Sequence, residues 1–94
     1  MTTCFDPYGW VPNEYYRWDL YNRAIDSIRH TVWGDKRGCL VIHDDCSKRL
    51  FPPPELDIPV HFTRKTEKKG IQLNNTECIT EACQYADWVL VFDS

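Results

Sequence analysis

Apolar residues in the first third of the chain recur three and four positions apart, which is the spacing of one face of an α-helix. The residues on this face are Trp18, Tyr21, Ala24, Ile25, Ile28 and Val32. Asn13 suits the N-cap position, and Gly34 suits the left-handed residue that follows many helices. The pattern therefore predicts a helix over residues 14–32 whose apolar stripe faces the core.

Two runs that are apolar at consecutive positions predict strands covered on both faces. The first strand is expected over residues 39–44 and the last over residues 88–92, and we expect both to pack in the core with the helix stripe. Residues 58–62 alternate between apolar and other side chains, which predicts a half-buried strand with Pro59 at a sheet edge. Residues 71–73 suit a short additional strand.

A second helix is predicted over residues 76–86, with Asn75 as its N-cap. Its apolar face consists of Ile79, Ala82, Cys83 and Ala86. A strand, a helix and a strand within residues 71–92 have about the minimum length of a parallel crossover. We therefore expect an α/β fold with two helices and a mixed sheet of three or four strands, in the order helix, strand, strand, optional strand, helix, strand. An α+β fold with an antiparallel sheet is the alternative.

The chain has 94 residues, so we expect a single domain over residues 1–94. Pro7, Gly9 and Pro12 predict an irregular, aromatic-rich N-terminal arm over residues 1–12. No apolar run is long enough to cross a membrane, and the first residues lack the pattern of a secretory leader. The five cysteines are an odd number and the expected compartment is the reducing cytoplasm, so free thiols are predicted.

The cysteines do not have the spacing of a metal site. Six residues separate Cys39 from Cys46, whereas paired zinc ligands usually have about two to four residues between them. Cys78 and Cys83 would diverge around a helix. Cys46 has two basic neighbours and a nearby histidine, which is the closest approach to a reactive thiol, but no catalytic signature surrounds it. We therefore expect no metal, no cofactor and no catalytic residue.

Acidic residues follow both apolar runs and suggest an alternative function. Asp44 and Asp45 end the strand predicted over residues 39–44, and Asp93 ends the last strand. If these strands are parallel neighbours, the three carboxylates converge beside His43 at the carboxyl edge of the sheet, where α/β folds bind ligands. The alternative is therefore a small-molecule or nucleotide-binding domain, or a small enzyme, that uses this acidic site. The chain has no glycine-rich phosphate loop, which argues against a nucleotide.

Charged and aromatic residues are segregated along the chain, whose net charge is −3. Residues 48–72 hold six basic and three acidic groups, whereas residues 73–94 hold four acidic groups and no basic ones. The basic residues are Lys48, Arg49, Arg64, Lys65, Lys68 and Lys69, and the aromatic residues outside the helix stripe include Tyr8, Trp10, Tyr15 and Tyr16. Aromatic and arginine side chains are enriched at the centres of protein interfaces.

The main hypothesis is therefore a small cytosolic binding protein without enzymatic activity, an inhibitor or regulator that contacts a larger protein through these aromatic and basic residues. A nucleic acid partner is not expected, because that function is typical of strongly basic domains. A membrane partner is not expected either, and the pattern does not define the oligomeric state.

Overall fold

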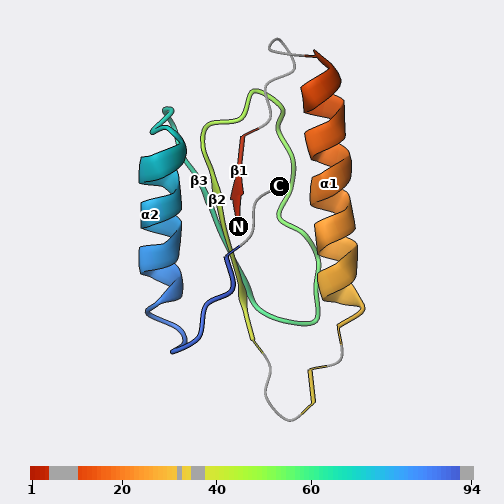
Figure 1. Cartoon of the computed structure of the whole chain (residues 1–94), viewed down its shortest axis with the longest axis vertical. Coiled ribbons are helices and arrows are strands. Elements are labelled where there is room, and N and C mark those ends of the chain that lie inside the picture. The colour runs from red at the N-terminus through yellow and green to blue at the C-terminus, as the bar shows by residue number, and fades with distance from the viewer. Residues whose placement is uncertain (5–10, 32, 35–37, 92–94) are drawn as a thin grey trace.

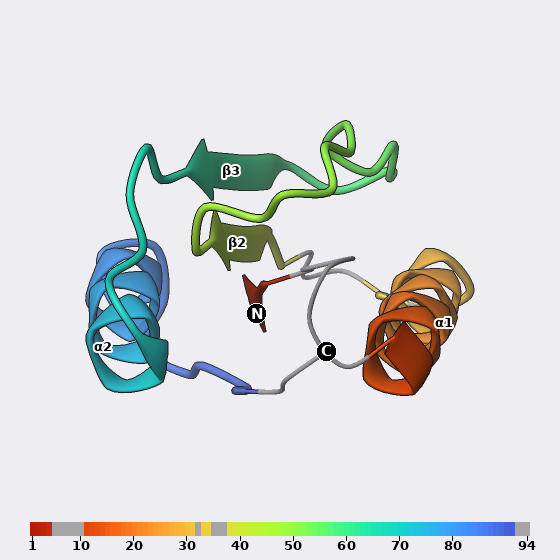
Figure 2. The same ribbon diagram turned by 90° about the horizontal axis from the view of Figure 1, so that it is seen from above.

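Two helices enclose a parallel sheet of three strands. The computed structural model describes residues 1–4, 11–31, 33–34 and 38–91, and it gives the backbone alone for residues 11–17. Its elements in chain order are β1 (Thr2–Thr3), α1 (Val11–Arg29), β2 (Leu40–Asp44), β3 (Val60–Arg64) and α2 (Ile71–Ala82). The strands lie in the order β1-β2-β3, and α1 and α2 cover opposite faces of the sheet (Figure 1 and Figure 2).

This architecture confirms the α/β class and the two helices. Both described strand pairs are parallel, so neither the mixed sheet nor the antiparallel alternative is confirmed. Neither described helix is both long enough and apolar enough to cross a membrane.

β2 is the central strand, and all five of its residues are buried. Its register with β3 runs from Leu40 beside Val60 to Asp44 beside Arg64, and His43 lies beside Thr2 of β1. A strand with neighbours at both edges and helices on both faces needs apolar residues at consecutive positions. The buried strand predicted over residues 39–44 and the edge strand predicted over residues 58–62 are therefore confirmed, although β2 begins at Leu40 and β3 is shifted by two residues, to Val60–Arg64.

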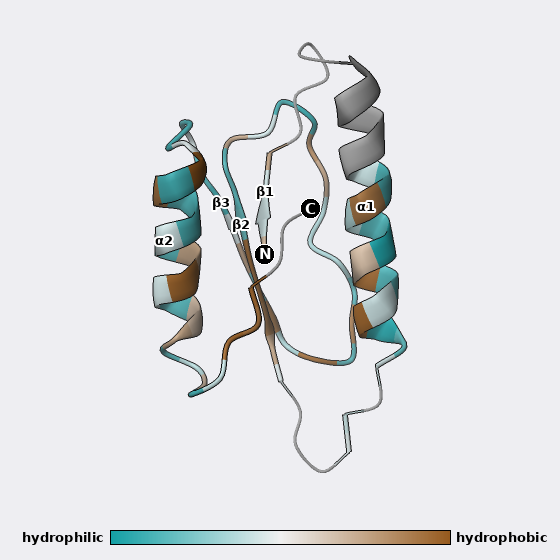
Figure 3. Cartoon of the chain, viewed as in Figure 1, coloured by the Kyte–Doolittle hydropathy of each residue, from teal (hydrophilic) through white to brown (hydrophobic). Residues whose placement is uncertain are grey.

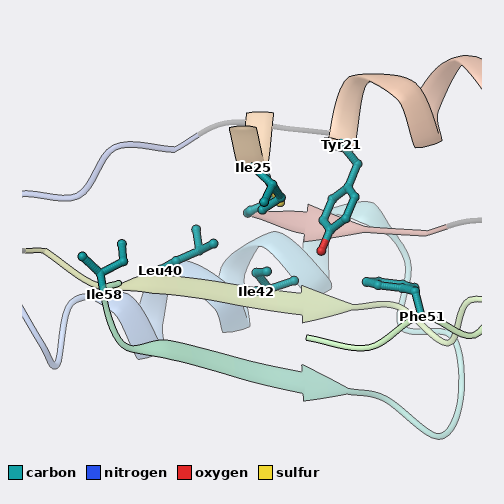
Figure 4. Close-up of a cluster of buried hydrophobic side chains, with 7 residues drawn as sticks. Tyr21, Ile25, Leu40, Ile42, Phe51 and Ile58 are labelled. Carbon is teal, nitrogen blue, oxygen red and sulfur yellow. The ribbon is translucent and has the colours of Figure 1, made fainter. Parts of the chain in front are cut away.

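The core lies between α1 and the sheet. Tyr21 and Ile25 point from α1 toward Leu40 and Ile42 of β2, as Figure 4 shows. The Phe51 ring closes the core, with its centroid 5.4 Å from that of Tyr21. Trp18, Ala24 and Ile28 are partly buried against the same cluster. The predicted helix stripe is thus confirmed, except at Val32, which lies outside the described residues.

The N-terminal arm predicted over residues 1–12 is regular at both of its described ends, and residues 5–10 lie outside the described part of the structure. Thr2 and Thr3 form β1, and α1 begins at Val11 and ends at Arg29, not at residues 14 and 32. Two threonines are too few to show a strand period. Pro12 is tolerated in the first helical turn because the N–H that it lacks has no partner there. Gly34 follows in a turn with φ of +63°.

α2 was predicted wrongly in its bounds and in its face. It spans Ile71–Ala82, so residues 71–73 are its first turn and not a strand. Asn74 and Cys78 are its buried residues, whereas Ile79 of the predicted apolar face is exposed. The sheet beneath α2 is polar at His43 and Lys65, which Asn74 contacts, whereas Cys78 lies against Val41. The helix therefore packs with a mixed side and not with its predicted apolar face.

The last strand, predicted over residues 88–92, is absent from the described residues, which end at Val91. Residues 88–91, which we call the apolar segment, are exposed: 93% of Trp88 and 83% of Leu90 are accessible to solvent. The segment runs from the end of α2 past β1, on the side away from β2 (Figure 2). An apolar run indicates a buried strand only where other residues cover it. Here Val89 and Val91 are partly covered, with 36% and 52% of their surface accessible, whereas Trp88 and Leu90 are not covered.

Alanine substitutions distinguish the core from the apolar segment. Ile42→Ala should lower the free energy of unfolding by about 2–5 kcal/mol, because this side chain is fully buried. Leu90→Ala should change it by less than about 0.5 kcal/mol, because Leu90 is exposed. Urea denaturation measures both values. A loss at Leu90 equal to that at Ile42 would show that the apolar segment belongs to the core.

Candidate functional site

Asp44 holds the carboxyl ends of the strands together. Its carboxylate is fully buried and accepts hydrogen bonds from Thr3 Oγ1 at 2.6 Å, from Ser47 Oγ at 2.5 Å and from the Ser47 backbone N–H at 3.1 Å. Arg64 Nε lies 3.8 Å from its second oxygen. These partners come from β1, β3 and the loop after β2, so the Asp44 carboxylate links three segments of the fold.

Tyr21 is affected by the same carboxylate. Burial, aided by the charge of Asp44, raises the pKa of Tyr21 to about 12. The phenol therefore keeps its proton at any physiological pH.

Asp45 points to the opposite face of the sheet, because successive residues of a strand alternate. It accepts the backbone N–H groups of Lys69 at 2.6 Å and Gly70 at 3.0 Å, immediately before α2 begins. The predicted acidic site is therefore not assembled from Asp44 and Asp45. Asp93 lies outside the described residues. Within the described part of the chain, no group of three or more histidine, cysteine or acidic residues could hold a metal ion.

His43 lies beneath α2, where it contacts a helix carboxylate. Its Nε2 is 2.8 Å from Glu81 Oε1, and the Tyr85 hydroxyl donates to Glu81 Oε2 at 3.0 Å. Burial disfavours the charged form of Glu81, but the hydrogen bonds from His43 and Tyr85 outweigh it and lower the pKa of Glu81. His43 Nδ1 is buried and has no hydrogen-bond partner among the described residues.

Lys65 completes a polar layer between α2 and the sheet. This buried lysine donates to Asn74 Oδ1 at 2.5 Å and pairs with Glu77 Oε2 at 2.8 Å. Asn74 Nδ2 in turn donates to the backbone carbonyl of His43 at 3.2 Å. We call His43, Lys65, Asn74, Glu77 and Glu81 the polar layer. Buried polar groups are costly without partners, so this layer fixes which side of α2 faces the sheet.

The six basic residues do not form one open surface. Lys65 is buried in the polar layer, and the Arg64 guanidinium lies 4.9 Å from the Phe51 ring centre. Arg49 lies over the Trp18 ring at 4.3 Å, and Lys69 pairs with Glu67 at 3.2 Å.

The two remaining basic residues, Lys48 and Lys68, are exposed. The side chains of Tyr8, Trp10, Tyr15 and Tyr16 lie outside the described part of the structure. A partner contact through the aromatic and basic residues stays a prediction.

All five cysteines are free thiols, as predicted. Cys78 is buried, and its Sγ lies 3.4 Å from the Met1 carbonyl oxygen. Cys46 is half-buried, in a left-handed backbone conformation with φ of +55°. Among the described residues, no histidine forms a hydrogen bond with either thiol.

The strongest candidate for a functional site is the apolar segment together with the pocket that it borders. This pocket has a volume of about 420 Å³ and lies among the first residues of β2, the last turns of both helices and the apolar segment. Its apolar walls include Met1, Leu40, Ile58, Ile79 and Ala82. Residues 88–91 make no hydrogen bond with any described residue. Figure 3 shows this hydrophobic stretch after the loop that follows α2.

Sequence reasoning identified this run but assigned it to the core. No local signal in the sequence could have found a binding role, because the five apolar residues that follow Asp87 suit a buried strand equally well. The fold and this site define a small α/β protein with an open apolar surface. Comparison with protein-family models, curated proteins and solved structures found no match.

Removal of the buried ammonium group tests the polar layer. Lys65→Met should lower the free energy of unfolding by about 1–3 kcal/mol, because it leaves the buried Asn74 oxygen without its donor. Lys68→Met is the matched control at an exposed position, and its effect should stay below about 1 kcal/mol. Equal effects in urea denaturation would show that the buried lysine adds no stability.

Two carboxylates of the polar layer should make the free energy of unfolding depend on pH. The hydrogen bond from Lys65 lowers the pKa of Glu77, and the pKa of Glu81 is lowered as described above. In acid the folded chain then binds fewer protons than the unfolded chain. The stability that these two carboxylates contribute is therefore present above the ordinary glutamate pKa of 4.5 and is lost as the pH falls below that value.

In the double variant Glu77→Gln/Glu81→Gln, stability should fall less steeply as the pH is lowered. Urea midpoints between about pH 7 and about pH 3 measure it. Glu55→Gln changes an exposed residue of the same type and should keep the wild-type slope. If the urea midpoint of the double variant falls with pH as steeply as that of the wild type, these two carboxylates are not the cause of the pH dependence.

Proposed function

We propose that this chain is a non-enzymatic protein-binding domain that takes up an extended segment of a partner protein along its apolar segment. The observation that carries this proposal is the exposure of four consecutive apolar residues whose backbone groups have no described hydrogen-bond partner. Contiguous exposed apolar patches on small proteins commonly mark interaction sites.

Burial of this surface supplies the driving force. Covering an exposed side chain such as Leu90 is worth about 1.5–3 kcal/mol, and Trp88 offers a still larger area. Trp88 is also suited to a binding role because tryptophan is common among the interface residues that contribute most of the binding energy. The proposed contact therefore moves from the aromatic arm and basic residues to the opposite end of the chain.

The backbone of the apolar segment supports strand addition as the mode of binding. An extended peptide that pairs with an unpaired backbone gains main-chain hydrogen bonds, while pockets for alternate side chains give specificity. The pocket of about 420 Å³ beside the segment is large enough for such side chains. In this proposal the apolar segment, residues 88–91, becomes the fourth strand when the partner binds, next to β1.

An inhibitor or regulator of a larger protein fits this mode of action, since such proteins work by occupying a surface. The free thiols support the cytoplasm as its compartment. A second candidate function is the binding of a small apolar molecule, which the volume and apolar walls of the same pocket favour.

Selection from a displayed library of random peptides tests the proposed function. The wild-type chain should enrich extended peptides with alternating apolar residues. The double variant Trp88→Lys/Leu90→Lys should bind those peptides at least about tenfold more weakly, because each lysine removes apolar contact area and adds a charge that must be desolvated.

Leu50→Lys provides the control, since Leu50 is also exposed and apolar but does not border the pocket. Fluorescence anisotropy with the enriched peptides measures the affinities, and circular dichroism checks that each variant is folded. Peptides that bind the double variant as tightly as the wild type would refute the apolar segment as the contact. Displacement of the peptides by small apolar compounds would favour the second candidate function.

A further inference from the structure

We infer that Cys4 and Cys46 form a disulfide when the chain is oxidised, and that this redox-sensitive bond ties β1 to the loop after β2. The inference is independent of the apolar segment and of the proposed function. It rests on the positions of the two cysteines, which follow the carboxyl ends of neighbouring strands.

The pairing of β1 with β2 brings the two cysteines together. Thr3 and Asp44 are partners in the register, and the Asp45 backbone N–H donates to the Thr3 carbonyl oxygen at 2.8 Å. Cys4 therefore lies beside Asp45, and Cys46 is one residue further along. With neighbouring strands about 4.8 Å apart, this offset places the two cysteine Cα atoms about 6 Å apart. Disulfides usually join Cα atoms that are about 4.4–6.8 Å apart.

The Cys4 thiol contacts the peptide group that leads to Cys46. Its Sγ lies 3.7 Å from the carbonyl oxygen of Asp45. In a trans peptide the following Cα atom lies about 2.8 Å from that oxygen, so Cys4 Sγ is within about 6.5 Å of the Cys46 Cα atom. A change of rotamer moves a cysteine sulfur by about 3 Å. Rotation of the two side chains can therefore bring the sulfurs into bonding distance with little movement of the backbone.

The backbone conformation of Cys46 suits this pairing. Thr3 contacts Asp44 on one face of the sheet, so alternation turns Cys4 to the other face, and in a continued strand Cys46 would return to the face of Asp44. Its φ of +55° rotates the Cβ atom about the N–Cα bond, out of this alternation. Left-handed values are uncommon for residues other than glycine and cluster at functional positions.

A small oxidant can reach both thiols, because Cys4 and Cys46 are half-buried, whereas Cys78 is buried. The oxidant is a low-molecular-weight disulfide such as oxidised glutathione. The thiolate of one cysteine attacks it, the S–S bond of the reagent breaks, and a mixed disulfide forms as one glutathione thiolate leaves. The thiolate of the other cysteine then displaces the second glutathione. The two thiols lose two electrons and two protons, and two molecules of reduced glutathione form.

Equilibration of the wild-type chain with mixtures of reduced and oxidised glutathione tests the inference. Mass spectrometry of the folded chain should show the loss of two hydrogen atoms without added glutathione, and peptide mapping should find the bond between Cys4 and Cys46. The equilibrium constant for this bond should fall at least about tenfold in about 8 M urea, because the unfolded chain no longer holds the two thiols close together.

Two serine variants locate the bond. Cys46→Ser should not form an intramolecular disulfide under the same conditions. Cys83→Ser removes an exposed thiol at the end of α2 and is the matched control, which should form the bond as readily as the wild type.

Hydrogen exchange measures the effect of the bond on β1. The backbone N–H groups of His43 and Asp45 donate to carbonyl oxygens of Met1 and Thr3, whereas that of Lys65 donates to β2. Exchange at His43 and Asp45 should be at least about threefold slower in the oxidised chain, because the bond keeps β1 in place, and exchange at Lys65 should change less.

A chain that keeps all its thiols, a bond between another pair of cysteines, or equal equilibrium constants in water and urea would overturn the inference. If Cys46→Ser still forms an intramolecular bond, the pair is wrong. If the bond forms but leaves the exchange at His43 and Asp45 unchanged, it does not tie β1 to the sheet, and that part of the inference fails.

Discussion

The structure depends on how the polar end of β2 is removed from water. His43, Asp44 and Asp45 are all buried at the end of the central strand, where an unpaired polar group would cost several kcal/mol. Each neighbouring element supplies partners for them: β1 and the loop after β2 bind Asp44, the turn before α2 binds Asp45, and α2 itself binds His43. The positions of β1 and α2 follow from these requirements.

The parts predicted from the sequence are those whose signal is local. The stripe of α1 and the apolar run of β2 depend only on spacing along the chain, and both are confirmed. The face of α2 depends on what lies beneath it, and that becomes polar only when β2 and β3 align in parallel and bring Lys65 near His43. β1 is found only through its pairing with β2, some 40 residues away in the sequence.

Prediction of the candidate site was limited in the same way, because its features depend on residues that are distant in the sequence. The rule that ligands bind at the carboxyl ends of parallel strands suggested an acidic site, but alternation along β2 turns Asp44 and Asp45 to opposite faces. For residues 88–91, composition alone does not distinguish a buried strand from an exposed binding surface, because both need apolar, strand-forming residues. Only the placement of the rest of the chain separates the two cases.

The polar layer also limits how this sequence can diverge. An apolar interface tolerates exchanges among residues of similar volume, whereas a layer of directional hydrogen bonds loses a partner with each single change. Lys65 and Glu77, or His43 and Glu81, are therefore expected to change together in related chains. Residues of the polar layer beneath α2 should therefore change in pairs during evolution, whereas residues of the apolar core under α1 should change one at a time.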